Sequence, residues 1–184
     1  VVVGLAPIAL LLLIIRLESP GSPIYRQERI GYRGQPLRIF KLRTMVADSD
    51  DVEKHLSPEQ LAQWRSERKV EDDPRVTRVG RFLRRTSLDE LPQFLNVLAG
   101  SMSIVGPRPV VADELPAYGT DVDAFLSMKP GITGWWQVQA RNDATYEDGS
   151  RQQLELYYVR NANLKLDVVV FLETFKSIIN KTGV

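Results

Sequence analysis

Residues Val1–Met45 read VVVGLAPIALLLLIIRLESPGSPIYRQERIGYRGQPLRIFKLRTM, and the elements they predict set the organisation of the rest of the chain. Thirteen of the first 15 residues are apolar, and Arg16 closes the run. A helix over residues 1–17 would be about 25 Å long, whereas crossing the roughly 30 Å hydrocarbon core of a bilayer takes about 20 apolar residues. Pro7 removes a backbone N–H and disfavours a straight helix. We therefore expect residues 1–18 to form a re-entrant membrane helix that breaks at Pro7 and leaves the bilayer on the side it entered.

Three other interpretations of this apolar segment stay open: the end of a full membrane span, the apolar region of a signal peptide, and a buried core helix. A signal peptide is disfavoured because no basic segment precedes the run. The chain starts with Val1 rather than Met, so residues upstream are expected. The turn Ser19–Pro23, rich in proline and glycine, ends the helix. The arginine-rich segment behind it predicts, by the positive-inside rule, that the rest of the chain lies on the cytoplasmic face.

Two segments typical of strands follow, Ile24–Ile30 and Pro36–Met45, around the turn Gly31–Gly34. In the second strand Lys41 and Arg43 are two residues apart, so their side chains project to the same face. Two neighbouring cations repel each other unless an anion lies between them. This spacing therefore favours a phosphate site at the end of a predicted hairpin.

Composition and charge narrow the class of protein. The 184 residues suffice for one domain with its own core. The absence of cysteine excludes a disulfide scaffold, a thiolate zinc site and a cysteine nucleophile, and a single histidine, His55, disfavours a Ser-His-Asp triad. The net charge of +1 hides a segregation, since residues 16–45 carry +5, residues 47–73 carry −5, and residues 75–85 hold five arginines and no acid. Such basic blocks indicate anionic partners, with a merely solvated charged face as the alternative. Without interleaved aromatics or a reader module, we expect no nucleic-acid partner.

The segment richest in candidate catalytic residues is Thr86–Gln93, which reads TSLDELPQ. Ser87 and Glu90 have the spacing of a capping box, so a helix is predicted to begin either after Ser87 or at Pro92. In both cases Asp89 and Glu90 lie at the N-terminal end of that helix, where the helix dipole favours anions and phosphate. The alternative is a capped helix whose acids do no more than complement the dipole.

Further along, Arg108 lies between Pro107 and Pro109, which fix the backbone on both sides and favour a phosphate-binding role. Alternating polar and apolar residues over Trp135–Arg141 predict a half-buried strand. Helices are predicted over Ser57–Lys69, Arg151–Arg160 and Asn163–Lys181. The last is amphipathic and lies either at a membrane interface or on a core. The segments together predict an α+β fold that is mostly helical with short strands, with a membrane helix over 1–18, a single unit over 19–184 and interfacial C-terminal helices.

Taken together, these segments resemble the bacterial sugar transferases, a family of monotopic phosphoglycosyl transferases. The resemblance covers nearly the whole chain, in the order apolar head, Ser19–Gly21 with Arg26–Gly31, Lys41–Met45, Asp73–Gly80, Leu88–Gln93, Val105–Pro109, Lys129–Trp135 and the C-terminal helix. Small members of this family carry Ser-Pro at the helix break, where this chain has Ala6-Pro7. Larger members carry further transmembrane helices and a domain upstream, so we expect this chain to be the catalytic end of such a protein.

The resemblance implies transfer of a sugar 1-phosphate from a UDP-sugar to polyprenyl (undecaprenyl) phosphate, the first membrane step of surface polysaccharide assembly. It implies that Asp89 attacks the sugar-linked phosphorus, forms a covalent phospho-sugar intermediate and releases UMP. It further implies that Glu90 holds Mg²⁺, with Asp89 as a second candidate ligand. Magnesium prefers carboxylate and phosphate oxygens and needs neither histidine nor cysteine. The candidate substrate- and phosphate-binding residues are Lys41, Arg43, Thr44, Arg78, Arg108 and Arg141.

The family also implies a place on the cytoplasmic face of the bacterial inner (plasma) membrane, with membrane lipid as a partner beside donor and acceptor. The sequence leaves open which sugar is transferred and whether the protein forms a homo-oligomer. The alternative from another class is a non-catalytic membrane-surface scaffold that binds anionic lipid through the basic blocks. The paired acids among the arginines argue against this scaffold, since a lipid clamp has no use for them.

Overall fold

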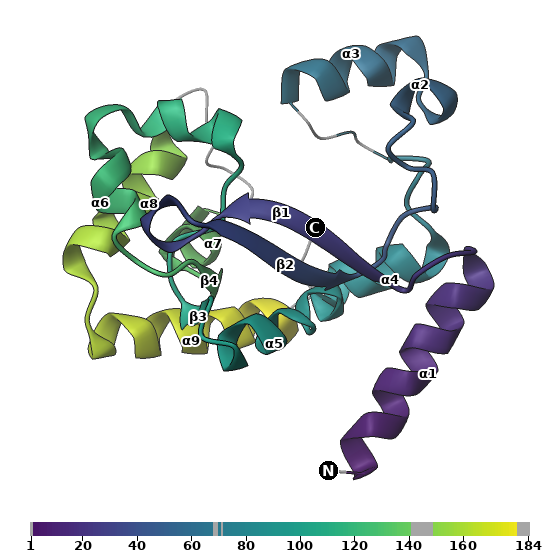
Figure 1. Ribbon diagram of the computed structural model, residues 1–184, viewed down its shortest axis with the longest axis horizontal. Coiled ribbons are helices and arrows are strands. Elements are labelled where there is room, and N and C mark those ends of the chain that lie inside the picture. Colours follow the sequence, from purple (N-terminus) through teal and green to yellow (C-terminus); the bar gives the residue numbers. More distant parts are fainter. Residues whose placement is uncertain (1, 68–69, 71, 141–148, 180–184) are drawn as a thin grey trace. The chain divides into compact units, whose positions relative to one another are not determined.

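A computed structural model describes residues 2–67, 70, 72–140 and 149–179 of the chain (Figure 1). It shows an α+β protein in which helices predominate and strands are short, which confirms the predicted class. The chain divides into two compact units: residues 2–25 and 42–89 form the first, and residues 26–41 and 90–179 form the second. Over the described ranges, no helix combines the length and the apolar character needed to cross a bilayer.

The first unit holds helices α1 (Val2–Glu18), α2 (Val52–His55), α3 (Pro58–Glu67) and α4 (Arg78–Thr86). Its core is formed by Ile15 of α1, Leu42 and Leu83. Partly buried apolar residues pack against them: Leu11 and Leu12 of α1, Val79 of α4, and Leu88. The last turns of α1 therefore belong to the core of this unit, although Leu13 and Leu17 of the same helix are exposed. The bounds of α1 enclose Pro7, and a break there stays a prediction.

Polar contacts also join the end of α1 to its neighbours in the first unit. The Glu18 carboxylate accepts the backbone N–H groups of Arg78 at 2.8 Å and Val79 at 3.1 Å, the first two residues of α4. The four N-terminal N–H groups of a helix lack partners within it, and the helix dipole favours a negative charge there. On the other side, the Arg43 guanidinium donates to the carbonyls of Ser19 and, at 2.9 Å, Pro20. Glu18 and Arg43 together fix how α1 meets the rest of this unit.

Gly80 allows α4 to lie directly on the backbone of Thr44. A Cβ atom at position 80 would lie 1.9 Å from the Thr44 carbonyl oxygen, far inside any real contact distance. The backbone N–H of Thr77, just before α4, donates to that same oxygen at 3.0 Å, and Met45 pairs with Val76 in an isolated antiparallel bridge. The segment after residue 42 is thus held against the start of α4 without room for a side chain.

Strands β1 (Ile24–Ile30) and β2 (Pro36–Leu42) are neighbours in a two-stranded sheet and are joined through the short 3₁₀ segment η1 (Tyr32–Gly34). This confirms the predicted hairpin, and the bounds of β1 are those expected from the sequence. The second strand ends at Leu42 instead of Met45. The reason is that Met45 turns to pair with Val76, so the chain has left the hairpin before that residue.

The second unit holds helices α5 (Gln93–Leu98), α6 (Val122–Leu126), α7 (Trp135–Ala140), α8 (Ser150–Asn161) and α9 (Leu164–Ile179), the 3₁₀ segment η3 (Ala112–Asp121), and strands β3 (Ser103–Val105) and β4 (Gly131–Thr133). Strands β3 and β4 are parallel, with Ser103 opposite Gly131 and Val105 opposite Thr133. Three apolar clusters stabilise the unit, centred on Tyr118, on Ile39 and on Tyr158.

The predicted strand over Trp135–Arg141 is wrong, because residues 135–140 form helix α7. The backbone N–H of Val138 donates to the Gly134 carbonyl at 3.3 Å, and the Trp136 side chain is buried. Six residues are too few to separate a two-residue from a 3.6-residue period when large apolar and polar residues alternate. The predicted helices over Arg151–Arg160 and Asn163–Lys181 are confirmed as α8 and α9, whose first residues lie within one residue of the predicted ones. The last two residues of the second prediction, 180 and 181, lie outside the described residues.

Candidate active site

The two predicted catalytic acids lie in a short 3₁₀ segment, η2 (Leu88–Glu90), between α4 and α5. The capping box predicted from Ser87 and Glu90 is wrong, because Ser87 ends the preceding helix. It adopts a left-handed conformation with φ of 55°, and its N–H donates to carbonyls in the last turn of α4. Helix α5 begins at Gln93 with Pro92 as its N-cap, so the later of the two predicted starts is the nearer one. The boundary between the two units falls between Asp89 and Glu90, and each acid belongs to a different set of contacts.

In the first unit Asp89 is accompanied by Arg84, a residue of the last turn of α4. The Arg84 Nε donates to the buried Thr44 hydroxyl at 3.0 Å. Burial lowers the pKa of the Arg84 guanidinium below its ordinary value, while the carboxylates of Asp89 and Asp73 act in the opposite direction. A guanidinium held by one nitrogen keeps its remaining N–H groups for anions. Asp89 therefore lies within the electrostatic reach of a cation that is fixed at its Nε, and predicted residue Thr44 contributes by orienting that cation.

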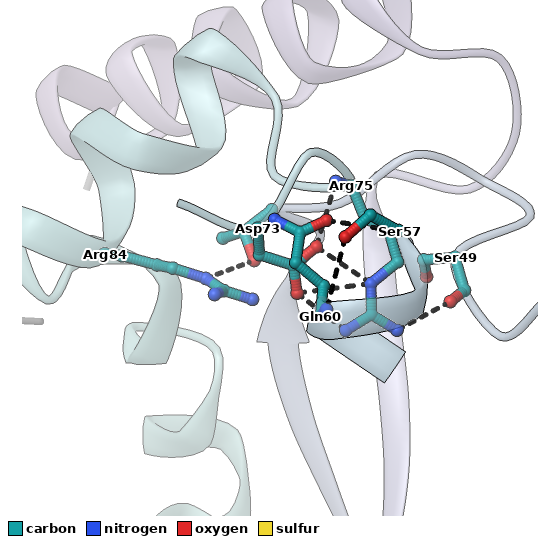
Figure 2. A network of polar contacts seen from close by, with 7 residues as sticks. Ser49, Ser57, Gln60, Asp73, Arg75 and Arg84 are labelled. Carbon is teal, nitrogen blue, oxygen red and sulfur yellow. Dashed lines mark hydrogen bonds and ion pairs between the residues drawn. The ribbon is translucent and has the colours of Figure 1, made fainter. Parts of the chain in front are cut away.

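Figure 2 shows a buried ion pair between Asp73 and Arg75 in the same network of polar contacts as Arg84. The Arg75 guanidinium forks onto the Asp73 carboxylate, with Nη2 2.6 Å from Oδ2 and Nε 2.9 Å from Oδ1, and both side chains are less than 10% exposed. A third donor, Nη1, reaches the Ser49 carbonyl at 3.0 Å. Burial raises the pKa of Asp73, but the hydrogen bonds from Arg75 outweigh it and hold that pKa below its ordinary value. The pair fastens residues 46–51 to the segment that leads into α4.

Two further predicted phosphate ligands, Arg43 and Arg78, lie where α1 meets the rest of the first unit. The Arg43 guanidinium is occupied by the Ser19 and Pro20 carbonyls, and burial together with the nearby Arg16 lowers its pKa. Arg78 is exposed, and its backbone N–H binds Glu18. The contacts of Arg43 give it a structural role at the end of α1. Its part in phosphate binding stays a prediction, as does that of Arg78.

In the second unit Glu90 forms an ion pair with Lys41, with 3.2 Å between Oε1 and Nζ and about a quarter of each side chain exposed. The pair depends on Asn96 of α5, which is almost completely buried. Its amide nitrogen donates to the Arg38 carbonyl at 2.8 Å, and its amide oxygen accepts the Phe40 N–H at 3.2 Å. Both bonds go to the edge of β2. Asn96 thereby binds α5 to the strand that carries Lys41, and two predicted site residues, Lys41 and Glu90, form an ion pair.

Arg108 lies in the loop Val105–Pro109, which interlocks with Lys129–Gly134. The Gly106 N–H donates to the Thr133 carbonyl and the Gly131 N–H to the Pro107 carbonyl, both at 2.9 Å. A Cβ atom at Gly131 would lie 2.2 Å from the Gly106 nitrogen, so glycine is required at this crossing. The Arg108 guanidinium lies 5.6 Å from the centre of the Trp136 ring.

The remaining predicted ligand, Arg141, lies outside the described residues. Arg84 is not among the predicted ligands, although a pair of arginines separated by three residues from two acids is a signal that could identify it. Within the described ranges, no group of three or more acidic, histidine or cysteine side chains is arranged to hold a metal ion. Magnesium in phosphoryl-transfer sites binds through one or two carboxylates, with phosphate oxygens and water completing its shell. Glu90, partly exposed and next to Asp89 in the chain, is a carboxylate of the kind that such an ion binds, and its role as a Mg²⁺ ligand stays a prediction.

Comparisons with known proteins show to which family the chain belongs. Residues 1–181 match the family described as bacterial sugar transferase, and the chain belongs to that family. It is 46% identical over 166 residues to the undecaprenyl-phosphate galactose phosphotransferase of Salmonella typhimurium, which covers 89% of this chain and 34% of the relative.

Two further relatives show the same pattern. The exopolysaccharide production protein ExoY of Sinorhizobium fredii is 42% identical over 185 residues, covering 98% of this chain and 81% of the relative. The UDP-glucose:undecaprenyl-phosphate glucose-1-phosphate transferase of Escherichia coli is 40% identical over 179 residues, covering 93% and 36%. The chain thus spans about a third of the Salmonella and Escherichia proteins and about four fifths of ExoY.

Proposed function

We propose that this chain transfers a sugar 1-phosphate from a UDP-sugar to polyprenyl phosphate. The observation that carries the proposal is the pair Asp89-Glu90, in which Glu90 forms an ion pair with Lys41 and Asp89 lies within the electrostatic reach of Arg84. The names of the relatives add undecaprenyl phosphate as acceptor and galactose and glucose as transferred sugars in those proteins. Which sugar this chain would transfer is a question for the experiment below.

In the proposed reaction an Asp89 carboxylate oxygen bonds to the sugar-linked phosphorus of the donor. The bond between that phosphorus and the bridging oxygen of the diphosphate breaks, and UMP leaves with the electron pair. A phosphate oxygen of the polyprenyl phosphate then attacks the same phosphorus and displaces Asp89, giving a polyprenyl diphosphate sugar. A carboxylate nucleophile divides one difficult displacement into two, provided that cations stabilise the charge on the phosphoryl oxygens.

Arginine and lysine supply those cations in the proposal. The free N–H groups of Arg84 are suited to the phosphoryl oxygens beside Asp89, because its Nε is already committed to Thr44. Lys41 and Arg108 are proposed for the donor diphosphate, and Arg43, Arg78 and Arg141 remain candidates from the sequence. Glu90 is the proposed Mg²⁺ ligand, with Asp89 as the second. When bound, the ion would neutralise charge on the diphosphate.

The proposal includes a membrane location, because the acceptor keeps its polyprenyl chain in lipid. Exposed apolar side chains support it in each unit separately. In the first they are Leu10, Leu13 and Leu17 of α1; in the second, Phe94 and Leu98 of α5 and Leu164, Phe171, Leu172 and Phe175 of α9. Exposed apolar surface of this extent marks protein or membrane contacts. We propose that α1 is re-entrant with a break at Pro7, that α9 lies at the interface, and that the site faces the cytoplasmic leaflet of the bacterial plasma membrane.

The test measures UMP release by the full chain in detergent, with polyprenyl phosphate, Mg²⁺ and a panel of nucleotide sugars. The wild type is expected to release UMP from at least one UDP-sugar. Asp89→Asn is expected to abolish release and to prevent radiolabelled sugar phosphate from staying on the protein. Asp113→Asn, which changes an exposed acid of η3, is the matched control and should behave as the wild type.

Two results would contradict the proposal. Full activity of Asp89→Asn would eliminate the covalent mechanism. Salt-sensitive liposome binding without Mg²⁺, with no UMP release from any donor and no dependence on Asp89, would favour the scaffold alternative instead.

A further inference from the structure

Glu155 of α8 is a fully buried carboxylate to which the proposed reaction assigns no role. Its side chain is 1% exposed. The backbone N–H of Arg108 donates to Oε2 at 3.2 Å, the Tyr118 hydroxyl of η3 donates to the same oxygen at 3.3 Å, and the Arg151 Nε lies 3.7 Å from Oε1. Burying a carboxylate is costly unless partners compensate it. Because three residues from three different segments contact this carboxylate, we infer that Glu155 has a specific role in this part of the fold.

The partners of Glu155 lead to Arg108. Both Arg108 and Arg151 lie over the ring of the buried Trp136, with their guanidinium carbons 5.6 Å and 4.1 Å from its centre. Two cations on one ring repel each other, and Glu155 is the carboxylate that contacts both residues. Within residues 2–67, 70, 72–140 and 149–179, the Arg108 guanidinium itself makes no hydrogen bond or ion pair to protein. Its five N–H groups are therefore available to an anion.

We propose that Glu155 is a positioning residue that holds Arg108 ready to bind the donor diphosphate. This inference rests on the proposed transferase function. Glu155 fixes the Arg108 backbone by accepting its N–H, while Pro107 and Pro109 restrict the backbone on either side. It also neutralises Arg151, which otherwise would push Arg108 away from the shared ring. Because Asp89 performs the chemistry, loss of Glu155 should weaken donor binding more than it slows turnover.

The protonation of Glu155 gives this role a distinct signature. Burial raises the pKa of Glu155 to about 7, against the opposing effects of Arg151 and Arg108. The charged and titratable groups that face it are Arg151 on its own helix, Arg108 in the loop after β3 and Tyr118 on η3. Above pH 7 the carboxylate is ionised and accepts the Arg108 N–H more strongly. The ratio of donor KM between a Glu155→Gln variant and the wild type should therefore rise as the pH increases from 6 to 8.

The experiment measures donor KM and kcat by UMP release with the full chain at saturating acceptor. Glu155→Gln should raise donor KM about tenfold at pH 8, as expected for the loss of a hydrogen bond to a charged group, with kcat within about threefold. Glu155→Asp, which keeps the charge, should show an intermediate KM. Glu114→Gln is the matched control, because the Glu114 carboxylate also accepts a backbone N–H, that of Val111, in the same unit.

A double-variant cycle shows whether Glu155 acts through Arg108. In an Arg108→Ala background, Glu155→Gln should raise donor KM no further, because coupled residues are not additive. If Glu155→Gln does not fold, Glu155→Asp takes its place in the cycle. An unchanged donor KM in a folded variant, a full effect in the Arg108→Ala background, or an equal effect of Glu114→Gln would overturn the inference. A wild type that releases no UMP would instead contradict the proposed function.

Discussion

Replacing Gly80 with alanine adds a single methyl group where α4 lies on the Thr44 backbone. The new Cβ would lie 1.9 Å from the Thr44 carbonyl oxygen and 2.7 Å from its carbonyl carbon. Both partners belong to the backbone, so no side-chain rotation relieves the contact. Reaching an ordinary separation of about 3.3 Å requires α4 to retreat by about 1.4 Å, nearly the rise of one helical residue. The next turn of α4 carries Arg84, which would move away from the Thr44 hydroxyl.

The expected cost follows from this displacement. Overpacking by one or two methylenes usually costs about 1–3 kcal/mol, and a clash against backbone belongs at the upper end or above it. In an exposed helix without this contact, the same change from glycine to alanine would stabilise the protein by about 1 kcal/mol. Any loss of stability in Gly80→Ala therefore comes from the close contact with Thr44. A loss of about 3 kcal/mol lowers Tm by roughly 6–12 °C in a chain of this size. UMP release should fall as well, because Arg84 loses its support.

Thermal unfolding of the full chain in detergent, followed by tryptophan fluorescence, checks the expected loss. Arg85→Ala, an exposed position five residues along the same helix, is the control and should shift Tm by about 2 °C at most. A Gly80→Ala variant with an unchanged or higher Tm would refute the close packing of α4 on Thr44. Reduced stability with full activity would refute the dependence of the site on that packing.

Asp73→Asn should destabilise the chain by about 3–5 kcal/mol in urea unfolding, because it leaves the buried Arg75 unpaired; a loss under 1 kcal/mol would contradict this. Because the pKa of Asp73 is held below its ordinary value of 3.8, its stabilising effect is present above about pH 4 and is lost as the pH falls through the lowered pKa. The acid side of the stability profile should accordingly be flatter in Asp73→Asn than in the wild type. Asn96→Leu should cost about 2–4 kcal/mol by leaving the Arg38 carbonyl and the Phe40 N–H without their partner, and it should speed amide exchange at Phe40. Unchanged exchange there would show that α5 does not depend on Asn96 to reach β2.

The capping-box spacing, a serine followed three residues later by glutamate or glutamine, occurs at Ser57 and at Ser87. Comparing the two positions shows how far a local sequence pattern predicts the structure. Ser57, where the sequence predicts a helix to begin, forms a reciprocal capping box with Gln60, with both N–H to side-chain oxygen distances at 3.2 Å. Ser87 and Glu90 have the same spacing but do not. Ser57 follows an extended residue, whereas Ser87 follows a helix that needs a left-handed residue at its end. Where α4 ends depends on its packing, which no local pattern records.

The sequence likewise predicts only part of the candidate site. Glu90 and Lys41 were both named from the sequence and form an ion pair, since the acid motif and the end of the strand are each locally distinctive. In the sequence Arg84 is one of the five arginines of residues 75–85, and its hydrogen bond to Thr44, 40 residues away, distinguishes it from the others. Glu155 reaches Arg108 over 47 residues. Strands β3 and β4 have three residues each, which is too few to show the alternation of polar and apolar residues that is typical of a strand. The close approach of Gly106 and Gly131 brings them together, and a local pattern does not reveal this contact.

The way α1 ends has a practical consequence for anyone who wishes to handle this protein without detergent. Shortening the chain to begin at Ser19 would remove structural contacts together with the apolar helix. Glu18 accepts backbone N–H groups at the start of α4, and Ile15 packs in the same core cluster as Leu83. Such a shortened protein would expose the apolar surface around Leu83 and leave the Arg78 and Val79 N–H groups at the start of α4 without their acceptor. A trimming strategy that keeps residues from about Leu11 onward, with polar replacements at exposed Leu13 and Leu17, preserves both supports.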